Sequence, residues 1–341
     1  MAKGADVSGA SVMKVLLVKL SSLGDVVHSL PAAVDIHRAF PNAQIDWVVE
    51  SGFAPLVERC AAVHRVIPCQ LRQWRKSPFA AHTRVEWRNF LSVLQAERYD
   101  VIIDLQGLTK SALVSWLANT NDIGQRFAMA NRTDGSGYEA PTRWVADVAL
   151  RIEPHIHAVA RGRALCAAAL KYDLPIGLDY GLGHAASAKS DQVVLVHGTS
   201  RADKEWPVSH WIELGKRLSL AGLRVVLPHG NVEEQHRAQS IALALPQATV
   251  WPRYSIDELT LHMATCRGVI GVDSGLSHIA VALDLPHVQI YNFDTAWRTG
   301  PTGIAHQCSV VNVNVPSVDD VWQAWQMCLQ QQAEPDAEVL L

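Results

Sequence analysis

The sequence lacks the features that mark several large classes of protein. Its six cysteines form no Cys-x-x-Cys pair and no cluster with histidines at zinc-ligand spacing, which argues against a structural zinc site. No apolar run reaches the roughly 18 residues that a membrane-spanning helix needs. The amino terminus also lacks the apolar core of a secretory signal. These absences predict a cytoplasmic protein with reduced, buried thiols.

The sequence also lacks an excess of positive charge. Its formal net charge is -3, which argues against the broad basic surface of a nucleic-acid-binding protein. The charge is unevenly distributed: residues 1–175 carry 20 basic and 16 acidic side chains, a net of +4, whereas residues 176–341 carry 10 and 17, a net of -7. An anionic substrate is therefore expected to favour the first half.

The pattern of apolar residues predicts an α/β fold. From Met13 onward, short β-branched runs alternate with longer helical patterns, which is typical of parallel sheets with crossover helices. The expected strands are Lys14–Lys19, Ile45–Glu50, Arg65–Pro68, Val101–Leu105, Val193–His197, Arg224–Leu227, Val269–Asp273 and His287–Tyr291. Their continuous apolar character indicates that both faces of each sheet are covered.

Breaks in this pattern divide the chain. Residues 1–12 are small and polar and are expected to form a disordered extension. Two α/β domains are expected at residues 13–175 and 191–341, joined by a linker, 176–190, that is rich in Gly, Ala and Ser. Apolar residues at helical spacing predict a closing amphipathic helix at 317–332, which could pack on either domain.

The loop Lys19–Asp25 follows the first expected strand and precedes a helix. Ligands of open α/β sheets bind at the carboxyl ends of strands, so Asp25 is expected to point into a crevice. An alternative is that Ser22 or Asp25 merely caps the helix. No Gly-x-Gly-x-x-Gly pattern is present in this loop, which argues against a dinucleotide-dependent oxidoreductase.

Polar residues follow several expected strands of the second half. Backbone N–H groups at the helix start near Gly275, with hydroxyls and a lysine close by, can hold a pyrophosphate without a metal, and Glu234 can accept from ribose hydroxyls. The residues of this expected nucleotide pocket are Thr199, Ser200, Lys204, Glu234, Asp273, Ser274, Gly275 and His278. A capped helix with His278 in the core is the alternative.

Two further groups are candidate acceptor contacts. The basic segment Arg72–Lys76 can hold an acidic ligand, although most such charge runs are solvated loops. The pair His155 and His157 lacks a nearby carboxylate or cysteine, so no metal site is expected there. At helical spacing, His157 and Arg161 can instead face the crevice together.

Several motifs resemble one known family. Residues 15–28 (VLLVKLSSLGDVVH), 46–50 (DWVVE), 104–108 (DLQGL) and 272–278 (VDSGLSH) occur in the order found in the ADP-heptose:lipopolysaccharide heptosyltransferases, and the similarity extends from about Met13 into the final helix. The resemblance implies a GT-B fold: two facing Rossmann-like domains with parallel sheets, a closing helix and the active site between them. Gln106–Leu108 and Arg72–Lys76 favour the enzyme that adds the first heptose over the one that adds the next.

The resemblance implies a metal-independent, inverting transfer of L-glycero-D-manno-heptose from ADP-heptose to the Kdo region of lipid A, at the cytoplasmic face of the inner membrane. No cofactor is implied. Asp25 would be the catalytic base. The donor residues would be Thr199, Ser200, Lys204, Glu234, Tyr254, Asp273, Ser274, Gly275 and His278, and the acceptor residues Ser22, Arg72, Arg75, Lys76, Gln106, His157 and Arg161.

The sequence departs from the family pattern in three places. Gln73 replaces an arginine of the basic segment, Tyr254 stands where relatives can carry Met, and Tyr291–Thr295 replaces a Gly-Pro-Thr-Asp type of loop. Three alternatives remain: the second heptosyltransferase, a nucleotide-sugar epimerase of the same fold, and a non-catalytic lipopolysaccharide- or nucleotide-binding protein.

Overall fold

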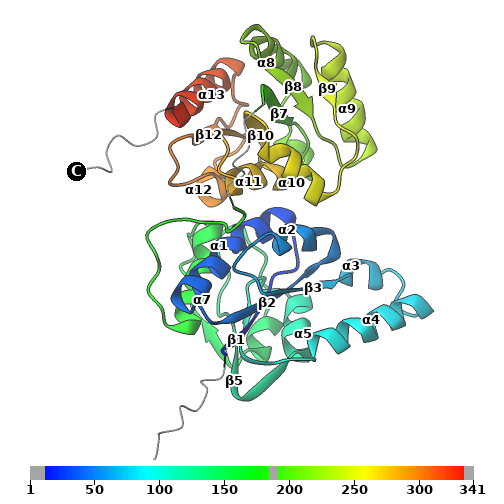
Figure 1. Cartoon of the computed structure of the whole chain (residues 1–341), viewed down its shortest axis with the longest axis vertical. Coiled ribbons are helices and arrows are strands. Elements are labelled where there is room, and N and C mark those ends of the chain that lie inside the picture. Colours follow the sequence, from blue (N-terminus) through cyan, green and yellow to red (C-terminus); the bar gives the residue numbers. More distant parts are fainter. Residues whose placement is uncertain (1–11, 184–189, 334–341) are drawn as a thin grey trace, which may run out of the picture.

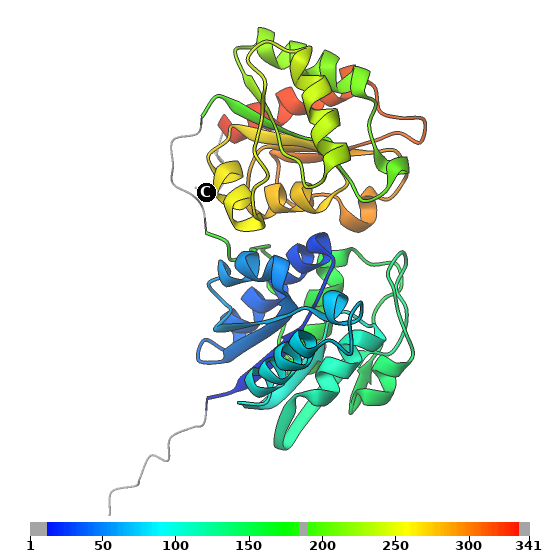
Figure 2. The same cartoon turned by 90° about the vertical axis from the view of Figure 1, so that its right-hand side faces the viewer.

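The computed structural model describes residues 12–183 and 190–333. The predicted extension, apart from Val12, therefore lies outside the described residues, as does the stretch 184–189 of the predicted linker. The chain forms two lobes, one above the other in Figures 1 and 2, which we call the first half (residues 12–183) and the second half (residues 190–333).

The first half contains one six-stranded parallel sheet in the order β3-β2-β1-β4-β5-β6. Its strands are β1 (Lys14–Val18), β2 (Gln44–Glu50), β3 (Arg65–Cys69), β4 (Arg98–Asp104), β5 (Asn119–Met129) and β6 (Val148–Leu150). Its helices are α1 (Leu23–Ala39), α2 (Ala54–Glu58), α3 (Leu71–Trp74), α4 (Ala81–Leu94), α5 (Thr109–Leu117), α6 (Pro141–Val145) and α7 (Ala158–Leu170).

The second half repeats this arrangement with a parallel sheet in the order β12-β11-β10-β7-β8-β9. Its strands are β7 (Gln192–Val196), β8 (Arg224–Leu227), β9 (Thr249–Val250), β10 (Gly268–Val272), β11 (His287–Tyr291) and β12 (Gln307–Val311). Its helices are α8 (Val208–Leu220), α9 (Val232–Leu243), α10 (Ile256–Ala264), α11 (Gly275–Ala282), α12 (Ala296–Thr299) and α13 (Val318–Ala333). Both sheets follow the doubly wound order 3-2-1-4-5-6, so the predicted pair of Rossmann-like units is confirmed.

All eight expected strands are present, each within three residues of its predicted ends. Four strands were not predicted: β5, β6, β9 and β12. The first part of β5 reads NTNDIGQ and is partly or fully exposed, so it carries no continuous apolar run. The strands β6 and β9 have only three and two residues, too few for a periodicity to register.

Each sheet is packed on both faces, and one apolar cluster crosses between the halves. Val15 and Leu17 of β1 belong to the same cluster as Val196 of β7 and Ile279 of α11. The contact passes through α1, which packs against α7 of its own half and α11 of the other. This shared core fixes how the carboxyl ends of the two sheets face each other.

The closing helix α13 begins and ends within one residue of its predicted bounds. It packs against β11, β12 and α8, so it covers the second sheet rather than the first. Within residues 12–183 and 190–333, none of the helices combines the length and the apolar character needed to cross a bilayer.

Candidate active site

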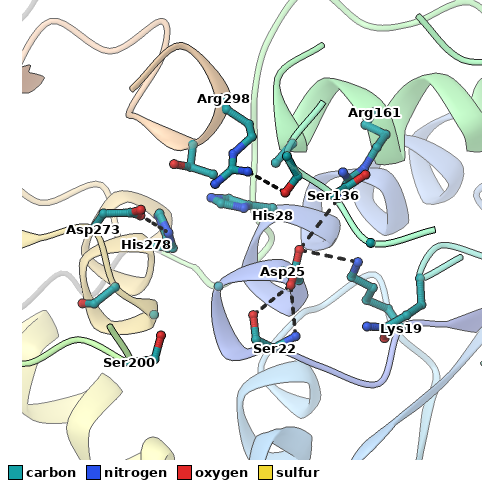
Figure 3. A pocket seen from close by; sticks show the side chains of 18 of the residues that line it. Lys19, Ser22, Asp25, His28, Ser136, Arg161, Ser200, Asp273, His278 and Arg298 are labelled. Atoms are coloured by element: carbon teal, nitrogen blue, oxygen red, sulfur yellow. Dashed lines mark hydrogen bonds and ion pairs between the residues drawn. The ribbon is translucent and has the colours of Figure 1, made fainter. Parts of the chain in front are cut away.

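Asp25 lies at the amino-terminal end of α1, where the first strand has just ended. Ser22 is the N-cap residue, and its backbone N–H and hydroxyl donate to Oδ2 of Asp25 at 3.1 Å and 2.8 Å. The other oxygen, Oδ1, lies 3.7 Å from Nζ of Lys19 and 3.8 Å from the guanidinium of Arg161 (Figure 3). The carboxylate therefore caps the helix with one oxygen and faces a cavity with the other.

The surroundings of Asp25 keep it ionised. Burial alone would raise its pKa, but the ammonium of Lys19 and the two hydrogen bonds from Ser22 outweigh burial and hold the pKa well below its usual range. Burial lowers the pKa of Lys19, and the charge of Asp25 opposes that shift. A charged carboxylate is thus fixed between two cations at the cavity wall.

His28 follows Asp25 by one helical turn and lines the same cavity, although the sequence analysis did not assign it to the site. Its ring centroid lies 4.2 Å from that of His278 in the other half and 6.1 Å from that of His157. Burial, followed by the neighbouring His278, holds the pKa of His28 well below its usual range. The spacing Asp-x-x-His on one helix face was the available signal.

Across the cavity, Asp273 is the first residue after β10. Its carboxylate accepts a hydrogen bond from Nζ of Lys204 at 2.5 Å and lies 3.4 Å from Nε2 of His278. Burial opposes ionisation of Asp273, but His278 and Lys204 outweigh it and hold its pKa well below the usual range. Thr199 donates to the backbone carbonyl of Asp273 at 3.0 Å. Ser274 caps α11 by accepting from the N–H of Ser277, and Ser274 and Gly275 line the cavity.

The amino-terminal ends of α1 and α11 meet at a contact that we call the seam. A Cβ atom placed on Gly24 would lie 2.6 Å from Cδ2 of His278, and one placed on Gly275 would lie 2.7 Å from Cδ2 of Leu23. Each half thus contributes one glycine against a side chain of the other. Any larger residue at either position would push the two helix ends apart.

Two connected cavities lie along this seam. The smaller, of about 280 Å³, holds Asp25, and the larger, of about 820 Å³, extends over the second half. Of the predicted site residues, the smaller cavity is lined by Ser22, Asp25, Gln106, Arg161, Ser200, Lys204, Asp273, Ser274, Gly275 and His278. The larger cavity is lined by Ser22, Thr199, Ser200, Glu234, Tyr254, Ser274 and Gly275. Residues that follow strands of both sheets therefore line the same two cavities.

The far end of the larger cavity carries Glu234 and Tyr254. Oε2 of Glu234 accepts from the backbone N–H of Gly230 at 2.6 Å, and Gly198 approaches the same carboxylate so closely that a Cβ there would lie 2.8 Å from its Cδ. The ring of Tyr254 stacks on His262 with centroids 4.4 Å apart. This end offers an aromatic surface and a carboxylate at a distance from Asp25.

Four predicted acceptor residues do not line either cavity. Arg72, Arg75 and Lys76 are exposed on and just after α3. His157 caps α7: its Nδ1 accepts from the N–H of Val159 at 3.2 Å, so its Nε2 donates to the carbonyl of Gly300 at 2.9 Å. Its side chain therefore links the halves and does not enter the cavity.

Gln106 lines the cavity, but its amide is largely committed to the backbone. Its Oε1 accepts from the N–H groups of Leu20 and Ser21 at 2.8 Å and 3.1 Å, and its Nε2 donates to the carbonyl of Ser21. Asp104 accepts from the N–H of Gln106 at 2.9 Å, and burial raises the pKa of Asp104 to about 6. Gln106 therefore shapes the loop that carries Ser22.

A second contact between the halves borders the smaller cavity. Arg298 donates to the carbonyl of Gly135 at 2.5 Å, and Trp297 stacks on His155 with centroids 3.7 Å apart. Arg298 and Ser136 line the cavity, and Figure 3 shows both beside Asp25 and His28. Neither residue was predicted, because Arg298 in the short helix α12 and Ser136 in the loop after β5 belong to no sequence motif. We call these contacts the clasp.

The described residues also bear on metal binding. Within residues 12–183 and 190–333, no group of three or more His, Cys, Asp or Glu side chains is arranged to hold a metal ion. The expectation that His155 has no nearby carboxylate is wrong, because the fold places Asp134 3.1 Å from its ring, where His155 also stacks on Trp297. The Lys and Arg side chains that line the smaller cavity are Lys19, Arg161, Lys204 and Arg298, and Arg253 lines the larger one.

Two Rossmann-like halves with connected polar cavities at their contact define the GT-B class of glycosyltransferase architecture. Residues 87–321 match glycosyltransferase family 9 (heptosyltransferase). Lipopolysaccharide heptosyltransferase 1 of Pseudomonas aeruginosa is 40% identical over 302 residues, covering 85% of this chain and 82% of the relative. The solved structure of the Escherichia coli heptosyltransferase WaaC with ADP superposes with a TM-score of 0.83 at 35% identity, covering 93% of this chain and 100% of that one.

The chain therefore belongs to glycosyltransferase family 9, the heptosyltransferases. The predicted family, GT-B fold and heptosyltransferase activity are confirmed, which goes against the alternatives of an epimerase and a non-catalytic binding protein. Identity to lipopolysaccharide heptosyltransferase 2 of Salmonella typhimurium is lower, 27% over 324 residues covering 88% of each chain. The comparison thus agrees with the predicted preference for the first heptosyltransferase over the second.

Proposed function

We propose that this heptosyltransferase transfers L-glycero-D-manno-heptose from ADP-heptose to the Kdo region of lipid A, with inversion at the anomeric carbon and without a divalent metal. The observation that carries the proposal is the position of Asp25. Its free oxygen faces a small cavity, and Lys204 and the start of α11 line the opposite wall. A base on one side and charge-stabilising groups on the other are what an inverting displacement requires.

The donor is assigned to the second half, residues 191–341. ADP would occupy the larger cavity of about 820 Å³, a volume suited to a nucleotide. Tyr254 would stack on the adenine, Glu234 would accept from the ribose hydroxyls, and Thr199, Ser200 and Lys204 would contact the pyrophosphate. The α11 N–H groups near Gly275 add positive partial charge at the same point. A relative supports this: the structure of Escherichia coli WaaC was solved with ADP.

The heptose would then lie in the smaller cavity, near Asp273 and His278, with its anomeric carbon toward the first half. The acceptor is assigned to residues 13–175. Ser22 and Arg161 line the cavity on this side, and Arg72, Arg75 and Lys76 carry positive charge outside it. Kdo carries a carboxylate, so cations on the acceptor side match its charge.

In the proposed step, Asp25 takes the proton of the acceptor hydroxyl on Oδ1. The acceptor oxygen forms a bond to the anomeric carbon as the bond from that carbon to the phosphate oxygen breaks, and the electron pair leaves with ADP. Lys204 and the N–H groups of α11 stabilise the departing charge. Lys204 pairs with Asp273 in this structure, so a bound pyrophosphate would share it.

The low pKa of Asp25 makes it a weak base in the open cavity. Proton transfer is therefore expected late in the step, when the acceptor oxygen is already bonding and its own pKa has fallen. Lys19 and Arg161 lie 3.7 Å and 3.8 Å from Oδ1, beyond hydrogen-bond length, which leaves room for a hydroxyl to donate to that oxygen.

Replacing Asp25 with Asn separates catalysis from helix capping. Asn retains an oxygen for the Ser22 donors but cannot act as a base. We expect kcat to fall by about 10²- to 10⁴-fold while ADP-heptose affinity and thermal stability change little. The exposed Asp122→Asn in β5 is the matched control and should behave like the unmodified enzyme. Full activity of Asp25→Asn would show that the residue is only a cap.

The absence of a metal requirement and the stereochemistry are tested separately. Transfer to a Kdo-bearing acceptor should be unchanged when the enzyme is assayed with a strong chelator. The anomeric configuration of the new heptoside, read by NMR, should be opposite to that of the donor. Loss of activity with chelator that returns with a divalent ion would refute the first claim, and retained configuration the second.

A further inference from the structure

The hairpin formed by α3 and α4, residues 71–94, carries a concentration of positive charge that the cavities do not use. It holds five basic side chains and one acidic side chain, although the whole chain has a net charge of -3. The five are Arg72, Arg75, Lys76, Arg84 and Arg88, and all are exposed. Within the described part of the chain, none of them forms an ion pair within 4.0 Å, so their charge is directed to solvent.

A rigid aromatic cluster supports this hairpin. The ring of Trp74 lies 5.5 Å from those of Trp87 and Phe90, and its indole N–H donates to Glu86 at 2.7 Å. Trp74 is buried, with 7% of its surface exposed, so it is not available for contact with a surface. The available aromatic group is Phe79, in the turn between the helices, which is 89% exposed.

The hairpin begins at the same edge of the first sheet as the loop that carries Asp25. It starts immediately after β3, and the N–H of Arg72 donates to Glu50 at the end of β2 at 3.2 Å. The strands of this sheet are parallel, so α3 begins at the same edge as the loop that carries Asp25. Figure 1 shows α4 and the α3–α4 turn projecting beyond the rest of the first half. A surface that touches the turn therefore lies on the acceptor side of the molecule.

We propose that this hairpin docks the enzyme on an anionic lipid bilayer, with Phe79 inserted among the headgroups and the five cations above the anionic lipids. Unpaired cations around one protruding aromatic ring match the chemistry of such a surface. The net negative charge of the remaining surface would repel it, which restricts contact to one orientation. The inference rests on the proposed function only in that a lipid A acceptor lies in a bilayer.

Vesicle sedimentation without donor or acceptor tests the docking directly. The full chain should bind vesicles that contain phosphatidylglycerol, bind pure phosphatidylcholine weakly, and lose affinity as salt is raised. Arg84→Ser/Arg88→Ser should weaken binding roughly 30-fold, about fivefold per arginine. Phe79→Ser should weaken vesicle binding by roughly tenfold at both low and high salt, because the lost contribution is hydrophobic and not electrostatic. None of these three residues lines a cavity.

Matched controls come from the other exposed groups of the first half. Trp144 is 74% exposed and Arg143 and Arg151 are exposed, all outside the hairpin, so Trp144→Ser and Arg143→Ser/Arg151→Ser should bind vesicles normally. Equal binding by all variants, or equal loss in the controls, would overturn the proposal. Circular dichroism melting checks that each variant is folded.

Activity measurements with two forms of the acceptor show whether the hairpin binds the bilayer or the acceptor sugar. On a water-soluble acceptor that carries Kdo without acyl chains, Arg84→Ser/Arg88→Ser and Phe79→Ser should keep kcat/KM within about twofold. On the same sugar anchored in anionic vesicles, they should lose activity in proportion to binding. Loss with the soluble acceptor as well would mean that Arg84, Arg88 and Phe79 bind the sugar, and would refute bilayer docking. Vesicle binding does not involve Asp25, so failure of the base assignment leaves this result unchanged.

Discussion

Substituting Gly24 by Ala tests whether the seam needs a glycine. The new Cβ would lie 2.6 Å from Cδ2 of His278, about 0.8 Å inside the 3.4 Å at which ordinary contact begins. Overpacking of this kind costs about 1–3 kcal/mol, and the gain in helix propensity from Gly to Ala offsets at most about 1 kcal/mol of it. We therefore expect a net loss of about 1–2 kcal/mol in the free energy of unfolding.

Gly162 in α7 is the matched control. It is also helical and lies in the same half, and a Cβ there meets nothing closer than 4.0 Å. Gly162→Ala should therefore stabilise the protein by about 0.5–1 kcal/mol. In urea denaturation the two variants should shift the midpoint in opposite directions. If Gly24→Ala is as stable as Gly162→Ala, the reasoning about the seam is wrong.

A double-mutant cycle locates the effect in the ring of His278. His278→Ala removes the three atoms that a Cβ on Gly24 would meet most closely, Cδ2, Nε2 and Cγ of the ring. In that background, Gly24→Ala should no longer destabilise the protein, which gives a favourable coupling energy of about 1–3 kcal/mol. Gly24→Ala alone should also raise KM for ADP-heptose, because the two walls of the cavity are pushed apart.

Two further outcomes are expected. His197 and His287 are fully buried, and burial lowers the pKa of each to about 4. The unfolded chain takes up their protons first, so the free energy of unfolding should fall as pH drops from about 6.5 to 4, by about 3 kcal/mol for each histidine. Urea unfolding at pH 7, 5.5 and 4.5 measures this, and a flat profile would contradict it. Trp297→Ala removes the stack on His155 at the clasp. It should raise KM for the acceptor severalfold with kcat nearly unchanged, whereas the exposed Trp144→Ala should not, and equal steady-state kinetics for both would argue against a role of the clasp.

Sequence reasoning predicted those parts of the fold that follow from local pattern. Strands such as β1 and β10 are continuous apolar runs, and burial on both faces produces that pattern directly. The strand β5 was missed because it gains its place from pairing with β4 and β6, not from its own polar residues. Strand pairing between distant segments leaves no periodicity in a single sequence.

In the site, too, residues that follow a local pattern were predicted, and residues placed by contacts between distant segments were not. Asp25 and Asp273 were predicted because each follows a buried strand, and topology brings the ends of such strands to one cleft. Arg298 was not predicted, because its contact with Gly135 joins residues 163 positions apart, in the short helix α12 and a loop, and neither segment carries a motif. For the basic segment, the sequence showed the positive charge directly. It could not show that Trp74 is buried and Phe79 exposed, because burial depends on how α3 and α4 pack.

The capping arrangement of Asp25 has a stereochemical consequence. Because Ser22 holds Oδ2 through two hydrogen bonds, the carboxylate cannot rotate freely, and only Oδ1 presents lone pairs to the cavity. Under the proposed mechanism, an acceptor sugar with several hydroxyls of similar acidity would react at the hydroxyl that reaches Oδ1 from this fixed direction. If Asp25 is the base, as we propose, the regiochemistry of the new glycosidic bond would be determined by the turn at the start of α1 rather than by the intrinsic reactivity of the acceptor.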